Sequence, residues 1–175
     1  MRGCTNVPLP YGDGRYTVDV LTRLKDNRYK LIKRVSLEAK KTDGYLLQPN
    51  LYVPFTPAWE YAREITDGRT AEAAFNTVCG WAMEHLVCDY IKSFTVSRVN
   101  ALPDPLSCWK KRMGICQDIA SLVTGMLRAA QIPAKLVIGR ADNRYHAWTV
   151  AVIKGRNYRF DRCGTAKTYK QDRCY

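Results

Sequence analysis

Hydrophobic and polar positions alternate near the start of the chain. A turn-prone Gly-Asp-Gly at residues 12–14 precedes an alternating stretch with Tyr16, Val18 and Val20, and apolar positions return after a polar segment. Alternation bounded by turn residues predicts a β-hairpin over residues 12–35. Prolines then punctuate an extended connector that ends near Phe55, so we divide the chain into a β-rich segment with its connector at 1–55 and a main domain at 56–175.

The pattern then changes to a spacing of three and four residues, which is typical of amphipathic helices. Thr56 followed by Pro57 predicts a short helix over 57–65, with the Thr56 side chain as its cap. A second helix is predicted from Thr70 to about Cys88. The clearest periodicity follows Gly114 and predicts a third helix that ends near residue 130.

Strand patterns close the chain. Residues 135–138, 145–153 and 157–161 are predicted strands, and the last two form a hairpin through Lys154, Gly155 and Arg156. Helices followed by strands indicate an α+β fold. If Ile153 paired with Tyr158, Val150 would lie opposite the residue at 161, about 13 Å along the strand from position 146. A bulge or a different register is needed to bring positions 146 and 161 together.

Charge and composition narrow the class of protein. The chain of 175 residues carries a formal net charge of +12, from 28 Lys and Arg against 16 Asp and Glu. The basic residues form short scattered groups without a nucleic-acid-binding motif, so we expect a solvated basic surface and no nucleic-acid partner. No apolar stretch approaches the roughly 18 residues that a membrane span needs, so no span is predicted.

Seven cysteines are many for a reduced cytosolic chain. If one is a catalytic thiol, the other six could form up to three disulfides, whose pairing the sequence leaves open. The first ten residues lack the apolar core of a signal peptide. The chain is then either cytoplasmic or lacks its export segment, and we favour a secreted or cell-surface protein.

Three residues could carry nucleophilic chemistry. Cys116 lies at the predicted start of the third helix, where unpaired N–H groups and the helix dipole favour a thiolate, although a small buried hydrophobic role is also open. A cysteine nucleophile needs a base and an acceptor that orients the base. His146, in a predicted strand, and Asp161, at the end of the next one, are the candidates, and Asp161 could equally be an ordinary strand-end carboxylate.

Other aromatic and histidine positions are less specific. His85, on the second predicted helix, is interpreted as structural. Trp148 lies two residues beyond His146, hence on the same face of the strand. It could pack in the core or form a wall of an active-site groove, and both interpretations stay open.

The ordered set of motifs resembles a known family. Gly114-Ile115-Cys116-Gln117-Asp118, Met126-Leu127-Arg128, Ile132-Pro133-Ala134, His146-Ala147-Trp148 and Phe160-Asp161 look like the bacterial transglutaminase-like superfamily. The resemblance implies a papain-like fold in which a nucleophile helix packs on an antiparallel sheet, with a small N-terminal β segment. It also implies that Cys116 attacks a carbonyl, His146 transfers the proton and Asp161 orients His146.

The resemblance implies acyl transfer or hydrolysis at peptide or amide bonds of a protein or cell-wall peptide. The backbone N–H of Cys116 and an upstream side chain would bind the oxyanion. Trp109 and Tyr90 are candidates for that side chain and, with Trp148, for substrate binding. No metal-binding spacing or phosphate loop is present, so no cofactor is expected. The alternative is an inactive binding module that uses its basic surface on an acidic partner.

Overall fold

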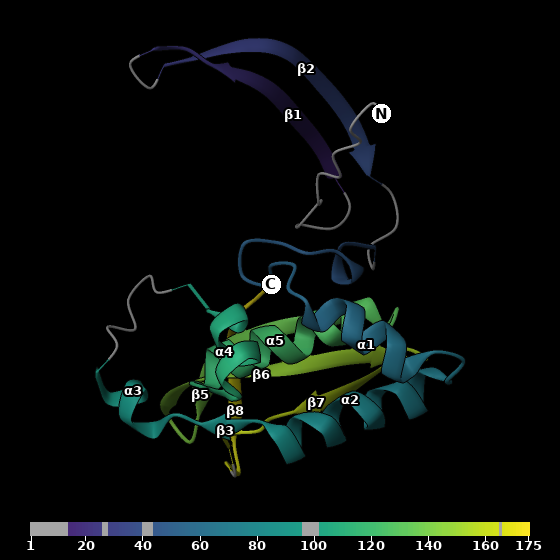
Figure 1. The fold of residues 1–175 in the computed structure, drawn as a ribbon, viewed down its shortest axis with the longest axis vertical. Coiled ribbons are helices and arrows are strands. Elements are labelled where there is room, and N and C mark those ends of the chain that lie inside the picture. Colours follow the sequence, from purple (N-terminus) through teal and green to yellow (C-terminus); the bar gives the residue numbers. More distant parts are fainter. Residues whose placement is uncertain (1–13, 26–27, 40–43, 96–101, 165) are drawn as a thin grey trace.

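The fold is described from a computed structural model, which covers residues 14–25, 28–39, 44–95, 102–164 and 166–175. Two parts are evident in Figure 1: a β-hairpin, and a body in which helices pack against a sheet. The mixed helix and strand architecture confirms the predicted α+β class.

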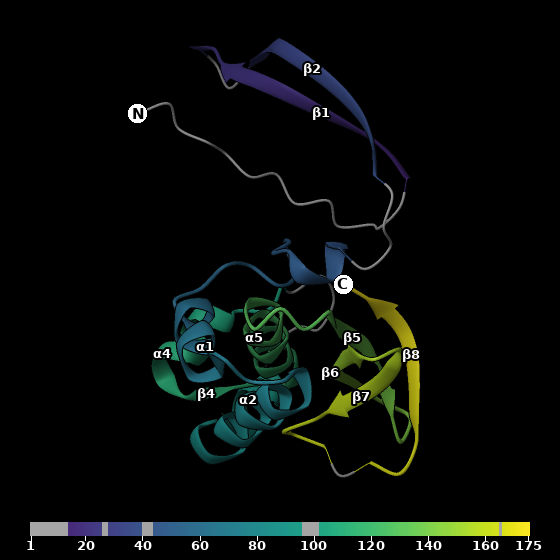
Figure 2. The same cartoon turned by 90° about the vertical axis from the view of Figure 1, so that its right-hand side faces the viewer.

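The hairpin is formed by β1 (Gly14–Arg23) and β2 (Tyr29–Ala39). The two strands are antiparallel, with Val18 opposite Val35 and a register shift after Val20. The predicted hairpin is therefore confirmed, although its second strand extends four residues further. Figures 1 and 2 both show it standing away from the body of the fold.

The connector after the hairpin packs against the body. A 3₁₀ turn, η2 (Gly44–Leu47), leads into it, and the Val53 side chain is fully buried in the core. The Arg128 guanidinium, itself fully buried, donates to the carbonyl oxygen of Gln48 at 2.6 Å. A buried guanidinium needs such acceptors, so the connector is fixed to the body by polar as well as apolar contacts. The division of the chain at residue 55 stays a prediction.

The helices of the body differ in part from the prediction. The structure contains α1 (Ala58–Thr66), α2 (Ala71–His85), α3 (Tyr90–Thr95), α4 (Pro105–Lys111) and α5 (Cys116–Ala129). The predicted Thr56 cap is wrong, because Pro57 is the residue that precedes α1 and the buried Thr56 Oγ1 lacks a hydrogen-bond partner in the described part of the chain. Thr70 does cap α2, accepting from the Ala73 N–H.

The sheet of the body has four antiparallel strands, in the order β7-β6-β5-β8. They are β5 (Ala134–Ala141), β6 (Arg144–Ile153), β7 (Arg156–Phe160) and β8 (Tyr169–Cys174). Two short parallel strands, β3 (Val87–Cys88) and β4 (Met113–Gly114), lie at the entrance to α5. Helix α5 packs on β5 and β6, and every residue from its second to its last is buried.

The register of the β6–β7 hairpin differs from the simple pairing considered above. Ile153 pairs with Arg156, and Thr149 pairs with Phe160, so the strands have the different register that is needed to bring positions 146 and 161 together. The loop holds only Lys154 and Gly155, both with positive φ (50° and 74°), as two-residue hairpins require. This tighter turn brings the end of β7 two residues closer to His146 along β6.

Among the described residues, no helix is long and apolar enough to cross a membrane.

Candidate active site

Cys116 is the first residue of α5, and only Ile115 separates it from the short strand β4. The carboxylate of Asp118, only 2% exposed, organises this helix start. It accepts hydrogen bonds from the Ile115 N–H at 3.3 Å, the Asp104 N–H at 2.8 Å and the Lys92 ammonium at 2.6 Å. Asp118 therefore holds the first turn of α5 against α3 and α4, and with it the thiol.

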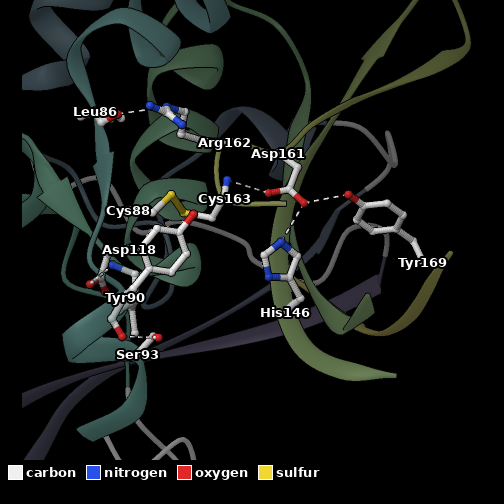
Figure 3. The surroundings of a disulfide bond; sticks show 11 residues. Leu86, Cys88, Tyr90, Ser93, Asp118, His146, Asp161, Arg162, Cys163 and Tyr169 are labelled. Atoms are coloured by element: carbon white, nitrogen blue, oxygen red, sulfur yellow. Dashed lines mark hydrogen bonds and ion pairs between the residues drawn. A yellow bond between two sulfur atoms is a disulfide. The ribbon is translucent and has the colours of Figure 1, made fainter. Parts of the chain in front are cut away.

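His146 on β6 and Asp161 beyond β7 form a hydrogen-bonded pair. The distance from His146 Nε2 to Asp161 Oδ2 is 2.7 Å, and both side chains are largely buried. Figure 3 shows the imidazole and the carboxylate facing each other. The ring of Trp148 is stacked with that of His146, with 6.4 Å between centroids, so the base is held on one side by an aromatic neighbour.

Two further groups donate to Asp161. The Tyr169 hydroxyl, at the start of β8, lies 2.9 Å from Asp161 Oδ2, and the Cys163 N–H lies 3.0 Å from Oδ1 (Figure 3). Burial alone would raise the pKa of Asp161, but these bonds and its contact with His146 hold that pKa below its usual value. Burial and the bond to Asp161 raise the pKa of Tyr169 to about 12, so Tyr169 remains a donor.

The electrostatics of His146 link it to both partners. Burial would lower the pKa of His146, but hydrogen bonds to Asp161 and to Cys116, together with their charges, raise it to about 9. Nε2 bonds to Asp161, so the other ring nitrogen, Nδ1, is the one available to the thiol. The structure thus places Cys116 and His146 in the lining of one cavity and bonds His146 to Asp161.

A cavity of about 810 Å³ opens beside this set. Its lining includes Cys116, His146 and Tyr145, the exposed aromatics Tyr90 and Phe94 of α3, and Arg144 at the start of β6. A cavity of this size accommodates several side chains of a ligand and places them against the thiol.

The cysteines fall into three groups. Cys88 and Cys163 form a disulfide at the edge of the cavity. Cys79 and Cys108 are free and buried, and burial raises the pKa of each to about 12. Cys116 and Cys174 are free and at least partly accessible. Cys4 lies outside the described residues.

The remaining predicted site residues lie in different places. Tyr90 lines the cavity, whereas Trp148 is 4% exposed and packs behind His146. Trp109 packs in an aromatic cluster with Tyr61 and Trp81 and is absent from the described residues that line the cavity. The ring of His85 stacks on Trp81 and its Nδ1 contacts the Trp81 carbonyl oxygen, a packing role.

Three contributors to the site were not predicted from the sequence: Tyr169, Gly164 and the Cys88–Cys163 pair. A Cβ added at Gly164 would lie 2.8 Å from His146 Nε2 and would overlap Asp161 Oδ2, so only glycine fits there. The glycine after Asp161-Arg162-Cys163 was a readable signal for such a close approach. Among the described residues, no group of three or more His, Cys, Asp or Glu side chains is arranged to hold a metal ion.

Three comparisons with known proteins bear on this arrangement. No curated protein sequence matches the chain. The fold resembles that of a candidate cysteine protease from Cytophaga hutchinsonii, with a TM-score of 0.63 and 14% identity over 98% of this chain and 74% of the other. It also resembles Legionella pneumophila LapG, with a TM-score of 0.53 and 14% identity over 67% of this chain and 72% of LapG.

A third similar structure is the periplasmic domain of TgpA from Pseudomonas aeruginosa bound to ethylmercury. Its TM-score is 0.52, with 15% identity over 89% of this chain and 68% of that domain. At these identities the structural likenesses establish the fold. The sequence model of the transglutaminase-like superfamily matches residues 60–161, which is more than half of the chain and extends from within α1 to Asp161. The chain therefore belongs to the transglutaminase-like superfamily.

Proposed function

We propose that this protein is a cysteine-dependent enzyme that cleaves or transfers acyl groups at peptide or amide bonds. One observation carries the proposal: His146 is hydrogen-bonded to Asp161, and it lines the same cavity as Cys116, the first residue of α5, whose interaction with the imidazole helps to raise the pKa of His146. A nucleophile, a base and a group that orients the base are the minimal set for such chemistry.

The proposed reaction begins with proton transfer from the Cys116 thiol to His146. An imidazolium with a pKa of about 9 keeps that proton at neutral pH, and the positive end of the α5 dipole favours the thiolate. The thiolate attacks the substrate carbonyl, His146 then protonates the leaving amine, and a thioester remains on Cys116. Asp161 stays ionised and keeps the ring oriented.

The oxyanion of the tetrahedral intermediate needs donors that are already in place. The first N–H groups of a helix have no partner within the helix, so the Cys116 N–H is the proposed backbone donor. Tyr90 lines the same cavity and stays a candidate for contact with the substrate. Trp109 also stays a candidate only, because it packs with Tyr61 and Trp81.

The proposed substrate is a protein or a cell-wall peptide. An open cavity lined by aromatic residues of α3 on one side and by Arg144 and Tyr145 on the other suits an extended chain with side chains. Water would resolve the thioester in a protease or amidase, and an amine would resolve it in a transamidase.

The proposal is tested by incubating the protein with a fluorogenic peptide library and with a primary amine, followed by mass spectrometry. The expected result is cleaved or amine-modified peptide, with an acyl adduct on Cys116, in the parent protein and neither in Cys116→Ala. Cys174→Ser is the matched control, because it removes another accessible thiol outside the cavity lining. Turnover that survives Cys116→Ala would reject the enzyme reaction proposed here, and a folded parent that processes no peptide would favour the binding module.

A further inference from the structure

The Cys88–Cys163 disulfide joins two segments that are 75 residues apart in the sequence. Cys88 ends β3, and its register partner in β4 is Gly114, two residues before Cys116. Cys163 lies two residues beyond Asp161. The bridge therefore connects the strand beside the nucleophile to the turn that carries the acid.

The sheet by itself does not fix Asp161. The last pair of the β6–β7 ladder is Thr149 with Phe160, so Asp161 lies just past the end of the hydrogen-bonded strand. A residue beyond the ladder has a backbone whose position depends on the turn that follows. Whatever holds that turn also holds the carboxylate.

The three residues after Asp161 each contribute to holding it. The Arg162 Nε donates to the Leu86 carbonyl oxygen at 3.0 Å, which ties the turn to the segment that leads into β3. The Cys163 N–H donates to Asp161 Oδ1 at 3.0 Å, so the bridged residue itself contacts the acid. Gly164 packs against both Asp161 and His146 without space for a side chain. Figure 3 shows the Arg162 and Cys163 hydrogen bonds around the disulfide.

We propose that Cys88 and Cys163 are positioning residues that act through Asp161: their disulfide holds the acid on His146, so activity requires this pair oxidised while Cys116 is a free thiol. This inference rests on the proposed function of the Cys116 site. Cys88, Cys163 and Cys116 line one cavity, and under the proposal the first two must be oxidised while Cys116 must be reduced.

The redox step is ordinary thiol–disulfide exchange. A dithiol reductant supplies two electrons and two protons, the Cys88–Cys163 bond becomes two thiols, and the dithiol closes into its own disulfide. Once the bridge is open, the turn keeps only the Arg162 hydrogen bond to Leu86 as its tie to that segment among the contacts described above. Asp161 then loses its fixed distance from His146, and misplacement of about 1 Å in an active site can cost about a hundredfold in rate.

The test is a double-mutant cycle on turnover and on the rate of iodoacetamide alkylation of Cys116. Cys88→Ser with Cys163→Ser is combined with Asp161→Asn. We expect the double-serine change to lower kcat about tenfold to a hundredfold, to move the pH profile of Cys116 alkylation as Asp161→Asn does, and to have little further effect once Asp161 is Asn. If the double-serine change lowered kcat by the same factor in the parent and in the Asp161→Asn variant, the proposal would be overturned.

Loss of stability is separated from loss of positioning by a control. Val78→Ala weakens the core on α2 without contacting the site, since Val78 is fully buried and absent from the cavity lining. It should lower the melting temperature and leave kcat and the pH profile unchanged. If the double-serine variant is likewise changed only in its melting temperature, the bridge merely stabilises the fold and the proposal fails.

If the double-serine variant does not fold, the parent protein provides the second measurement. A dithiol opens the bridge at low temperature, and activity and circular dichroism are measured on aliquots that are not alkylated, while alkylation of Cys88 and Cys163 in separate quenched aliquots, read by mass spectrometry, reports how far the bridge has opened. Activity that falls in step with opening, while the fold persists, is the expected result. Full activity once the bridge is open in most of the protein, or unfolding in step with opening, would each overturn it. Loss of turnover in Cys116→Ala tests the proposed function separately.

Discussion

The nucleophile and the acid are held by different kinds of interaction. Cys116 begins a helix whose remaining thirteen residues are all buried, so its position follows from the packing of α5. Asp161 lies beyond the end of a strand and is held by His146, Tyr169 and the Cys163 N–H. The position of Cys116 depends on many packing contacts along α5, whereas the position of Asp161 depends on a few hydrogen bonds. Changes near the acid should therefore impair chemistry without unfolding, and changes along α5 should do the reverse.

The largest effect on chemistry is expected at the nucleophile itself. Cys116→Ala should lower kcat/KM by at least about a thousandfold, because the thioester can no longer form. The thiol is a small group at the mouth of the cavity, so the free energy of unfolding should change by less than about 1 kcal/mol. Turnover and urea denaturation of the same preparation check both statements. A large loss of stability would mean that Cys116 is mainly a core residue.

Three glycine-to-alanine substitutions separate the two regions. Gly164→Ala should reduce kcat about tenfold to a hundredfold, because its Cβ would overlap Asp161. Gly125→Ala should instead cost about 1–3 kcal/mol of stability, because its Cβ would lie 2.6 Å from Trp59 Nε1 in the core. Gly80→Ala is the control, since its Cβ meets no atom within 4 Å and alanine favours the helix.

Kinetics and denaturation of the three variants check this contrast. If Gly164→Ala lost stability and Gly125→Ala lost activity, the division between packing on the nucleophile side and specific contacts on the acid side would be wrong.

A smaller effect is expected at Tyr169. Tyr169→Phe removes one hydrogen bond to Asp161 but keeps the ring that contacts Trp148 and Arg159. One positioning bond among three should be worth about 1 kcal/mol, or about fivefold in kcat. The conservative variant should leave KM and the melting temperature unchanged. A rise in KM with unchanged kcat would assign Tyr169 to substrate binding instead.

The smallest expected effect is on the pH dependence of the free energy of unfolding. The folded pKa of His146 is raised from 6.5 to about 9, so its contribution to stability is fully present below about pH 6.5 and is lost as pH rises through 9. The difference in unfolding free energy between the parent and His146→Ala should therefore shrink between these pH values. Urea denaturation at pH 6 and pH 9.5, repeated in a Cys116→Ala background, measures it. If the difference in unfolding free energy between the parent and His146→Ala grew with pH, His146 and Asp161 would not form a stabilising ion pair.

The parts of the site that the sequence predicted are those with local signals. The periodicity after Gly114 predicted α5, and the ordered Cys116, His146 and Asp161 motifs predicted which residues the fold brings together. The helices α3 and α4 were missed because each is shorter than the length over which periodicity is informative.

The missed parts depend on contacts between distant residues. The β6–β7 register depends on a left-handed conformation at Lys154, which the side chain of a lysine does not indicate. Strand β8 is almost entirely polar, so its pattern did not predict a strand that brings Tyr169 to Asp161. The pairing of Cys88 with Cys163 spans 75 residues, and spacing alone leaves disulfide pairing open.

The most direct test of the account is the pH dependence of iodoacetamide alkylation, resolved by peptide mass spectrometry, in the parent and in His146→Ala. Cys79 and Cys108 are buried thiols with a pKa of about 12, and Cys174 is an exposed internal standard. The account predicts that Cys116 reacts faster than Cys174 at pH 6 in the parent and that His146→Ala removes this difference. Equal rates for Cys116 and Cys174 in the parent would contradict the catalytic pair.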